Sequence, residues 1–234
     1  MSWKFLNTGF RTGTFNMQLD EALALRLKDE SGSPTLRVYG WDPTTISIGF
    51  NQQMEDFDLR KVLEDGIEIV RRPTGGRAIL HAHELTYSVV LHRENRGPLA
   101  LYRLISEGLL QSLKLLGIEA QLSTNEVKFK QTYQHSSSIP CFSSSAKYEI
   151  QYDGRKLIGS AQRRYGDIVL QHGSLLLGPQ HRTIVDYLAP RAHDSKRVLE
   201  EHLLTHTTDV ETILGRRVNF EEAADCMRKG FEFV

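Results

Sequence analysis

Cysteine is scarce in this chain: only Cys141 and Cys226 occur in 234 residues. They lie far apart and show no metal-ligand spacing, which argues against a disulfide framework or a cysteine zinc site. Sparse cysteines of this kind predict reduced thiols and a cytoplasmic location. A free thiol can also serve as a catalytic nucleophile, so one of the two is a candidate for that role.

The chain also lacks an excess of charge of one sign and a long apolar run. Its 29 Lys and Arg residues cancel its 29 Asp and Glu residues, so no global field attracts nucleic acid or an anionic membrane. No apolar stretch approaches the roughly 20 residues that span a bilayer. The segment after Met1 has no apolar signal-peptide core. We therefore expect neither nucleic acid nor a membrane as a partner.

Internal repeats and long linkers are absent as well, and a length of 234 residues suits one large domain. We expect a single domain over residues 1–234, with no separate C-terminal domain. Helical and strand-like segments alternate irregularly, which predicts an α/β (α+β) fold with a mixed, largely antiparallel sheet flanked by helices. No Gly-x-Gly-x-x-Gly fingerprint or P-loop is present, so a doubly wound nucleotide-binding fold is not expected.

Local patterns place several elements of this fold. Apolar residues at every fourth position from Phe15 to Leu27 predict an amphipathic helix that buries this stripe. A second helical stripe covers residues 102–116, and a third covers 220–233. Asp153-Gly154 lies between two strand-like runs and predicts a hairpin with a type I′ turn, which needs positive φ at both central residues.

The most informative segment runs from Arg71 to His81, with the sequence Arg-Arg-Pro-Thr-Gly-Gly-Arg-Ala-Ile-Leu-His. Strand-like runs over 67–70 and 85–91 flank it. A glycine pair lets backbone approach a bound group closely, and neighbouring N–H groups can then hold an anion or a carbonyl. The arginines add positive charge. The simpler interpretation is a surface loop with two solvated arginines.

A second group of unusual residues surrounds the predicted hairpin. Cys141 follows Pro140, which disfavours a helix here, and a thiol on a loop is more reachable. Lys156 follows the Asp-Gly turn and lies opposite Gln151 in a two-residue hairpin. Burial favours the neutral amine of a lysine, which can accept a proton from a thiol. The simpler interpretations are an exposed Lys156 on an edge strand and a half-buried Cys141, while Cys226 is predicted to pack in the core.

The histidines do not predict a metal site or a hydrolase. His81 and His83 share one side of an extended segment, but no third ligand follows at a suitable spacing. The chain has no Gly-x-Ser-x-Gly elbow, so Ser-His-Asp hydrolase chemistry is not expected. His172 is predicted to shape a pocket rather than to act as a base.

Four motifs in this order resemble the lipoate–protein ligase and octanoyltransferase superfamily, which shares its fold with biotin protein ligases. They are Phe15-Asn16-Met17-Gln18-Leu19-Asp20-Glu21-Ala22, Arg71-Arg72-Pro73-Thr74-Gly75-Gly76, Lys156-Leu157-Ile158-Gly159-Ser160-Ala161-Gln162-Arg163 and Gln171-His172-Gly173-Ser174-Leu175-Leu176. Four ordered motifs are far more specific than any one of them. The resemblance covers about residues 3–187 and implies the biotin/lipoate protein ligase fold.

In that family the Arg-Arg-Gly-Gly loop and the lysine strand line a tunnel for an eight-carbon acyl chain. The lysine contacts the acyl carbonyl and its leaving group, and the resemblance gives that role to Lys156. It implies substrate-binding roles for a larger set, namely Arg71, Arg72, Thr74, Gly75, Gly76, Arg77, His81, Gly159, Ser160, Ala161, His172 and Gly173.

Two chemistries share this fold, and the loop distinguishes them. ATP-dependent ligases continue it as Gly-Gly-Gly and then His-Asp-x-Gly-Asn, whereas this chain has Arg77 and then His81-Ala82-His83-Glu84-Leu85. An arginine in place of the third glycine would crowd an adenylate phosphate. The loop with Arg77, the Glu-Leu-Thr-Tyr-Ser-Val run after it and Cys141-Phe142 resemble the cysteine-dependent octanoyltransferases of the LipM type.

That resemblance implies an acyltransferase of protein lipoylation. The octanoyl group would pass from octanoyl-acyl carrier protein, through a thioester on Cys141, to a lysine of a lipoyl-domain or glycine cleavage H protein. The acyl donor is carried on the phosphopantetheine of acyl carrier protein, so no other cofactor is expected. Two alternatives stay open, an ATP-dependent lipoate–protein ligase and a non-catalytic acyl or carrier-protein binding module.

Overall fold

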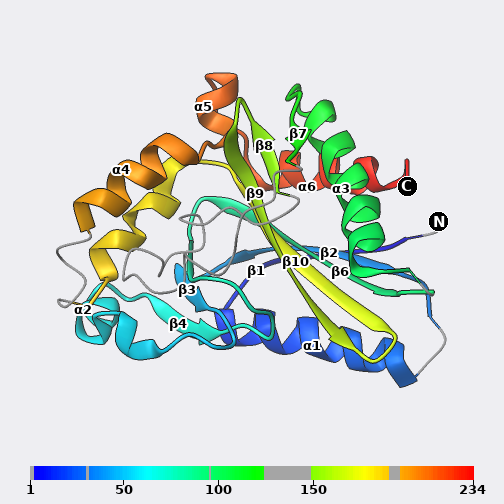
Figure 1. Cartoon of the computed structure of the whole chain (residues 1–234), viewed down its shortest axis with the longest axis horizontal. Helices are drawn as coiled ribbons and strands as arrows, with labels where there is room; N and C mark the ends of the chain where they lie inside the picture. Colours follow the sequence, from blue (N-terminus) through cyan, green and yellow to red (C-terminus); the bar gives the residue numbers. More distant parts are fainter. Residues whose placement is uncertain (1–2, 30–31, 95, 124–148, 190–195) are drawn as a thin grey trace.

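A seven-stranded mixed sheet forms the centre of the molecule (Figure 1). The computed structural model describes residues 3–29, 32–94, 96–123, 149–189 and 196–234. The strands follow the order β1 (Lys4–Arg11), β2 (Thr35–Trp41), β6 (Glu84–His92), β10 (Ile168–Leu176), β9 (Arg155–Tyr165), β8 (Ile150–Tyr152) and β7 (Gln121–Leu122). β1 and β2 are parallel and the other neighbours are antiparallel. The predicted fold class is confirmed.

One face of this sheet is apolar and packs against two helices. Because side chains alternate along a strand, Leu36 and Val38 of β2 share this face with Leu85 and Tyr87 of β6. The helices α3 (Pro98–Leu115) and α6 (Phe220–Phe231) contact each other and cover this face (Figure 1). Both correspond to predicted helical stripes, and the partly buried Cys226 packs against this core from α6, as expected.

The opposite face carries polar residues and is covered by α1 (Gly13–Asp29) (Figure 1). The helix was predicted correctly, and Leu23 and Leu27 of its predicted apolar stripe pack against the sheet as expected. The start of the stripe is wrong: Phe15 is 43% exposed, while Asn16 and Asp20 are fully buried. Both polar side chains bond to Arg37 of β2, which is itself fully buried. Because a buried guanidinium needs hydrogen-bond partners, the start of the helix presents these two polar side chains to the sheet instead of Phe15.

A second, three-stranded sheet lies beside the first. It was not predicted as a separate sheet, although one of its strands matches the strand-like run predicted over 67–70. Its order is β4 (Glu68–Arg71), β3 (Thr45–Ile48) and β5 (Ile79–His81), with β3 parallel to β4 and antiparallel to β5. The loop with the glycine pair connects β4 to β5. It therefore joins the two outer strands of this small sheet.

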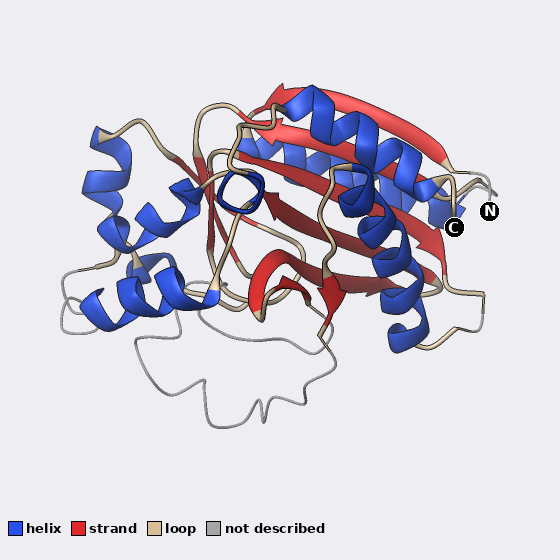
Figure 2. Ribbon diagram, turned by 90° about the horizontal axis from the view of Figure 1, so that it is seen from above, coloured by secondary structure: helices blue, strands red, loops and turns tan. Residues whose placement is uncertain are grey.

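Short helical segments cover the small sheet at one end of the molecule (Figure 2). These segments are η1 (Met54–Asp56), α2 (Leu59–Glu64), η5 (Pro179–Tyr187) and α4 (Lys196–His206), and α5 (Val210–Leu214) follows α4 along the chain. They share an apolar cluster with Ile46 and Ile48 of β3. None of the helices in the described part of the chain combines the length and the apolar character needed to cross a bilayer.

The predicted hairpin is confirmed in detail. Asp153 and Gly154 have φ values of 48° and 70°, as a type I′ turn requires. Lys156 lies opposite Gln151. However, β8 and β7 lie beyond β9, so β9 is an interior strand of the sheet. The interpretation of Lys156 as an exposed residue on an edge strand is therefore wrong.

Candidate functional site

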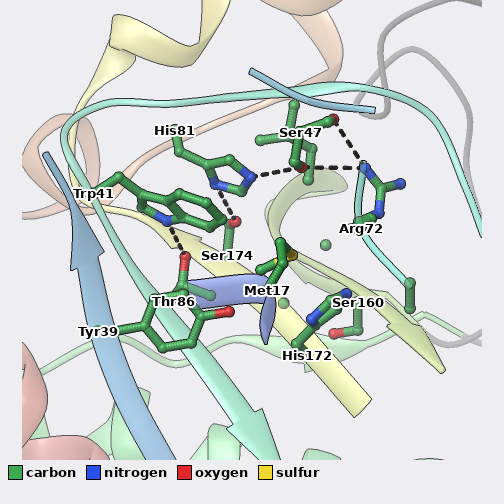
Figure 3. A pocket seen from close by; sticks show the side chains of 14 residues that line it. Met17, Tyr39, Trp41, Ser47, Arg72, His81, Thr86, Ser160, His172 and Ser174 are labelled. Atoms are coloured by element: carbon green, nitrogen blue, oxygen red, sulfur yellow. Dashed lines mark hydrogen bonds between the residues drawn. The ribbon is translucent and has the colours of Figure 1, made fainter. Parts of the chain in front are cut away.

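A pocket lies between the polar face of the large sheet, α1 and the small sheet (Figure 3). The space between its lining residues amounts to about 350 Å³, part of which is open to solvent. Its lining residues are Met17, Tyr39, Trp41, Ser47, Arg72, Ile79, His81, Thr86, Gly159, Ser160, Ala161, His172, Gly173 and Ser174. All four sequence motifs contribute to this lining.

The structure gathers part of the predicted site at this pocket and leaves part outside its lining. The predicted residues that line it are Arg72, His81, Gly159, Ser160, Ala161, His172 and Gly173. The predicted residues described elsewhere are Arg71, Thr74, Gly75, Gly76, Arg77 and Lys156. Cys141 and most of the polar segment 121–139 lie outside the described residues. The substrate-binding and catalytic roles of these residues stay predictions.

The two arginines of the glycine-pair loop hold backbone carbonyls. Arg72 is 4% exposed and donates to the carbonyl of Gly75 at 2.9 Å and to that of Arg77 at 2.6 Å. Arg71 donates to three carbonyls of residues 49–52, the shortest to Gln52 at 2.6 Å. The interpretation of two solvated arginines is therefore wrong for Arg72, which is buried, whereas Arg71 is exposed and still donates to backbone carbonyls.

Glycine is required where this loop meets the end of β3. Gly76 has a φ of 94°, a conformation that side chains disfavour. A Cβ on Gly49 would lie 2.0 Å from the carbonyl oxygen of Gly76. A Cβ on Gly75 would meet nothing within 4 Å. The close backbone approach that the sequence suggested is therefore made by Gly76, to another segment of the protein itself.

His172 connects this loop to α1 through a buried chain of hydrogen bonds. Its Nε2 lies 2.7 Å from the Thr74 hydroxyl, and its Nδ1 lies 3.1 Å from Asp20. Burial lowers the pKa of His172, so the ring is neutral at neutral pH. Burial alone would raise the pKa of Asp20, but the hydrogen bond from His172 and the charge of Arg37 outweigh it and lower that pKa. His172 shapes the pocket, as predicted.

A second buried chain runs through His81 on another side of the pocket (Figure 3). His81 Nε2 lies 2.7 Å from the Ser47 hydroxyl, and His81 Nδ1 lies 2.8 Å from Glu84. The Trp41 ring stacks on the imidazole at 3.9 Å between centroids, and the Trp41 N–H donates to Thr86 at 2.7 Å. A hydroxyl, an imidazole and a carboxylate are thus aligned next to the pocket.

Sequence reasoning did not single out Asp20, Arg37, Ser47 and Glu84, although all four are at most 3% exposed. A signal was present for two of them. Arg37 interrupts an apolar run between Leu36 and Val38, and Glu84 begins an alternation of polar and apolar residues along β6. Polar residues at alternate positions of a buried strand point to a polar site on one face.

Lys156 is 5% exposed and forms an ion pair with Glu149, which is 3% exposed. Its carbonyl accepts a hydrogen bond from the N–H of Thr208. Three residues further along β9, Gly159 begins the segment that lines the pocket. Lys156 is therefore held by its ion pair with Glu149 and lies on the same strand as the pocket-lining Gly159. Among the described residues, no group of three or more His, Cys, Asp or Glu side chains could hold a metal ion.

Comparisons with known proteins identify the family of this chain. Residues 12–232 match the family model of the lipoyl protein ligase A/B catalytic domain. The octanoyltransferase LipM of Symbiobacterium thermophilum is 40% identical, over 98% of this chain and 85% of its own length. LipM of Kyrpidia tusciae is 38% identical, over 98% of this chain and 86% of its own length.

Solved structures show the same fold. A bipartite lipoate protein ligase from Thermoplasma acidophilum, described with its E2 lipoyl domain, has a TM-score of 0.78 at 20% identity and covers 100% of this chain and 83% of its own. Lipoate-protein ligase A bound with ATP has a TM-score of 0.72 at 22% identity, with coverages of 100% and 85%. The resemblance inferred from the four motifs is confirmed. The chain belongs to the family of the lipoyl protein ligase A/B catalytic domain, and its curated relatives there are octanoyltransferases.

Proposed function

We propose that this protein is an octanoyltransferase of protein lipoylation that uses Cys141 as its nucleophile. The octanoyl group comes from octanoyl-acyl carrier protein and passes to a lysine of a lipoyl domain or glycine cleavage H protein. The observation that carries this proposal is the similarity to LipM octanoyltransferases along 98% of the chain. The pocket built from all four motifs supports it.

The pocket is suited to the acyl chain. Met17, Ile79 and the Trp41 ring provide apolar surface. Each buried methylene contributes about 0.8 kcal/mol. Pocket depth can therefore rank neighbouring chain lengths, although it does not exclude them absolutely.

In the first step, the Cys141 thiolate attacks the carbonyl carbon of the acyl carrier protein thioester. A new C–S bond forms, the original C–S bond breaks, and the phosphopantetheine thiol leaves with a proton. One thioester replaces another, so no ATP is consumed. The ion pair with Glu149 favours the ammonium form of Lys156. Of the two roles open to this lysine, a cation that stabilises the thiolate and the developing oxyanion is therefore favoured over a general base.

In the second step, the amine of the carrier lysine attacks the acyl group on Cys141. An amide C–N bond forms, the C–S bond breaks and the thiol is restored. The lipoyl-domain partner draws support from the related ligase of Thermoplasma acidophilum, which is described with its E2 lipoyl domain. Both carriers must reach the same acyl group in turn, so the kinetics are expected to be ping-pong.

The test is intact-protein mass spectrometry after the purified chain is mixed with octanoyl-acyl carrier protein without ATP. We expect one octanoyl adduct on the wild-type chain and none on Cys141→Ser. Cys226→Ser is the matched control, because Cys226 is the other thiol of the chain and lies on α6, outside the pocket lining. The adduct should disappear when a lipoyl domain is added, as the domain gains the octanoyl group.

Lys156→Met should slow adduct formation by about 100-fold or more if the cation assists the attack. Two outcomes contradict the proposal. Transfer that appears only with ATP and free fatty acid supports an ATP-dependent ligase. Binding of an acyl chain or a carrier protein without transfer under either condition supports a binding module.

A further inference from the structure

We propose that Ser47, His81 and Glu84 form a second nucleophilic centre in the pocket, which hydrolyses short-chain carboxylic esters independently of Cys141. The absence of a Gly-x-Ser-x-Gly elbow argued against hydrolase chemistry at the level of sequence. That motif belongs to one fold, however, whereas the same constellation of hydroxyl, imidazole and carboxylate recurs in several chain orders. It is recognised by its geometry.

The geometry of these three residues matches the roles of such a triad. Ser47 Oγ lies 2.7 Å from His81 Nε2, and His81 Nδ1 lies 2.8 Å from Glu84 Oε1. The same Glu84 oxygen accepts hydrogen bonds from Thr86 at 2.5 Å and Ser174 at 3.0 Å. Because this oxygen is an acceptor, Nδ1 carries the proton of His81. Nε2 is then the base that can accept the proton of Ser47.

The imidazole is held in this orientation from two directions. The Trp41 ring stacks on it at 3.9 Å with an angle of 13° between the planes. The Trp41 N–H donates to Thr86, which in turn donates to Glu84. Ring position and carboxylate position are therefore fixed together, which is the preorganisation that a nucleophile and base pair requires.

Ser47 borders the pocket, and a positively charged side chain lies beside it. Ser47 and His81 both line the pocket (Figure 3). Arg72 Nη1 donates to the Ser47 hydroxyl at 3.3 Å and to the Ser47 carbonyl at 3.0 Å, so a positive charge lies beside the nucleophile, where it favours a developing negative charge. Glu84 Oε2 is buried without a hydrogen-bond partner among the described residues. Such burial is costly, and the carboxylate gains a compensating interaction when His81 becomes an imidazolium.

The related chain of Thr74, His172 and Asp20 does not qualify as such a centre. Thr74 is fully buried and is not part of the pocket lining. Asp20 already faces the guanidinium of Arg37 at 2.7 Å. Ser47 and Thr74 each form a hydrogen bond with a histidine Nε2, but only Ser47 lines the pocket.

The reaction needs no cofactor. Ser47 Oγ forms a bond to the ester carbonyl carbon while His81 Nε2 takes its proton, and the C–O bond to the alcohol breaks as His81 protonates the leaving oxygen. Water then attacks the acyl-Ser47 ester through the same base. The acid is released, and the Ser47 hydroxyl is restored.

The test uses the full chain carrying Cys141→Ala, so that the thiol cannot contribute. We would incubate it with a fluorophosphonate probe, map the labelled residue by mass spectrometry and measure saturable hydrolysis of 4-nitrophenyl butyrate. We expect the label on Ser47. Ser47→Ala should abolish labelling and lower kcat/KM at least 100-fold, and Glu84→Gln should lower it by about 100- to 10,000-fold.

Ser88→Ala is the matched control. Ser88 is fully buried on the same sheet face as Glu84, and its hydroxyl has no partner among the described residues. This variant should be labelled at the parent rate. Ser47→Ala removes a single oxygen, so a folded variant is expected, and its thermal melting curve verifies this. No label on a folded parent, or equal labelling of Ser47→Ala, overturns the proposal. Neither result affects octanoyl transfer, which is measured separately on the chain with Cys141 intact.

Discussion

Acid should destabilise this protein through one buried histidine, His181 of η5. The side chain is 4% exposed, and its Nε2 lies 2.8 Å from the hydroxyl of Thr207. That hydroxyl donates its own proton to the carbonyl of Leu203 at 2.5 Å, so His181 Nε2 donates to it, while Nδ1 lies 3.4 Å from the carbonyl of Gly178. Burial, helped by the charge of Arg182, lowers the pKa of His181 to about 3.

The direction and size of the effect follow from this pKa. In the unfolded chain a histidine titrates near 6.5, so below that pH the unfolded state binds a proton that the folded state does not accept. The stability that the protein gains from keeping His181 neutral is fully present above pH 6.5, and it is lost as the pH falls from 6.5 toward 3. At pH 5 the loss relative to pH 8 is about 2 kcal/mol, at about 1.4 kcal/mol per pH unit. A folded pKa of 4 would give nearly the same loss at pH 5.

The assay is urea unfolding at pH 8 and pH 5, compared between wild type and His181→Gln. The amide of glutamine can still donate toward Thr207 but does not titrate. The variant should lose about 2 kcal/mol less than wild type between the two pH values, whatever its stability at pH 8. His92→Gln, at the partly exposed end of β6, is the control and should behave as wild type. Equal losses for wild type and His181→Gln would refute the reasoning.

Three further substitutions test packing. Gly49→Ala places a Cβ 2.0 Å from the carbonyl oxygen of Gly76, and the resulting shift of the loop should cost about 1–3 kcal/mol in thermal unfolding; an unchanged melting temperature would contradict that contact. Asp20→Asn leaves the buried charge of Arg37 unpaired and should cost about 3–5 kcal/mol in urea unfolding; a cost below 1 kcal/mol would mean that the pair is solvated. Phe231→Ala empties a site that is 1% exposed between α6 and α3 and should cost about 3–5 kcal/mol at an unchanged m value, whereas a cost typical of a surface residue would place the ring outside the core.

Local chemistry accounts for the parts of the fold that the sequence predicted correctly. Asp153-Gly154 determines its turn because few other residue pairs accept positive φ at both positions. The small sheet was missed because β5 has three residues, too few for a periodic pattern. The buried side of the start of α1 was mispredicted because Asn16 and Asp20 form hydrogen bonds with Arg37, and the leucine spacing does not reveal these bonds.

The site divides in the same way. The resemblance to the family pointed to Arg72, His81 and His172, all of which line the pocket. It could not identify Ser47 or Asp20, because their partners His81 and His172 lie 34 and 152 positions away in the chain. Nothing in the local sequence distinguishes these residues from ordinary polar residues of a strand or a helix.

The sequence by itself determined the family, the order of the motifs and the hairpin that presents Lys156, because these depend on residue identity and on neighbours in the chain. Only the tertiary structure decided that Lys156 is buried against Glu149, that both arginines of the loop hold carbonyls and that Ser47 faces His81. Burial and hydrogen-bond partners arise where distant segments pack together, and an unpaired polar group there is costly. Long-range packing therefore determines what each side chain of the pocket can do.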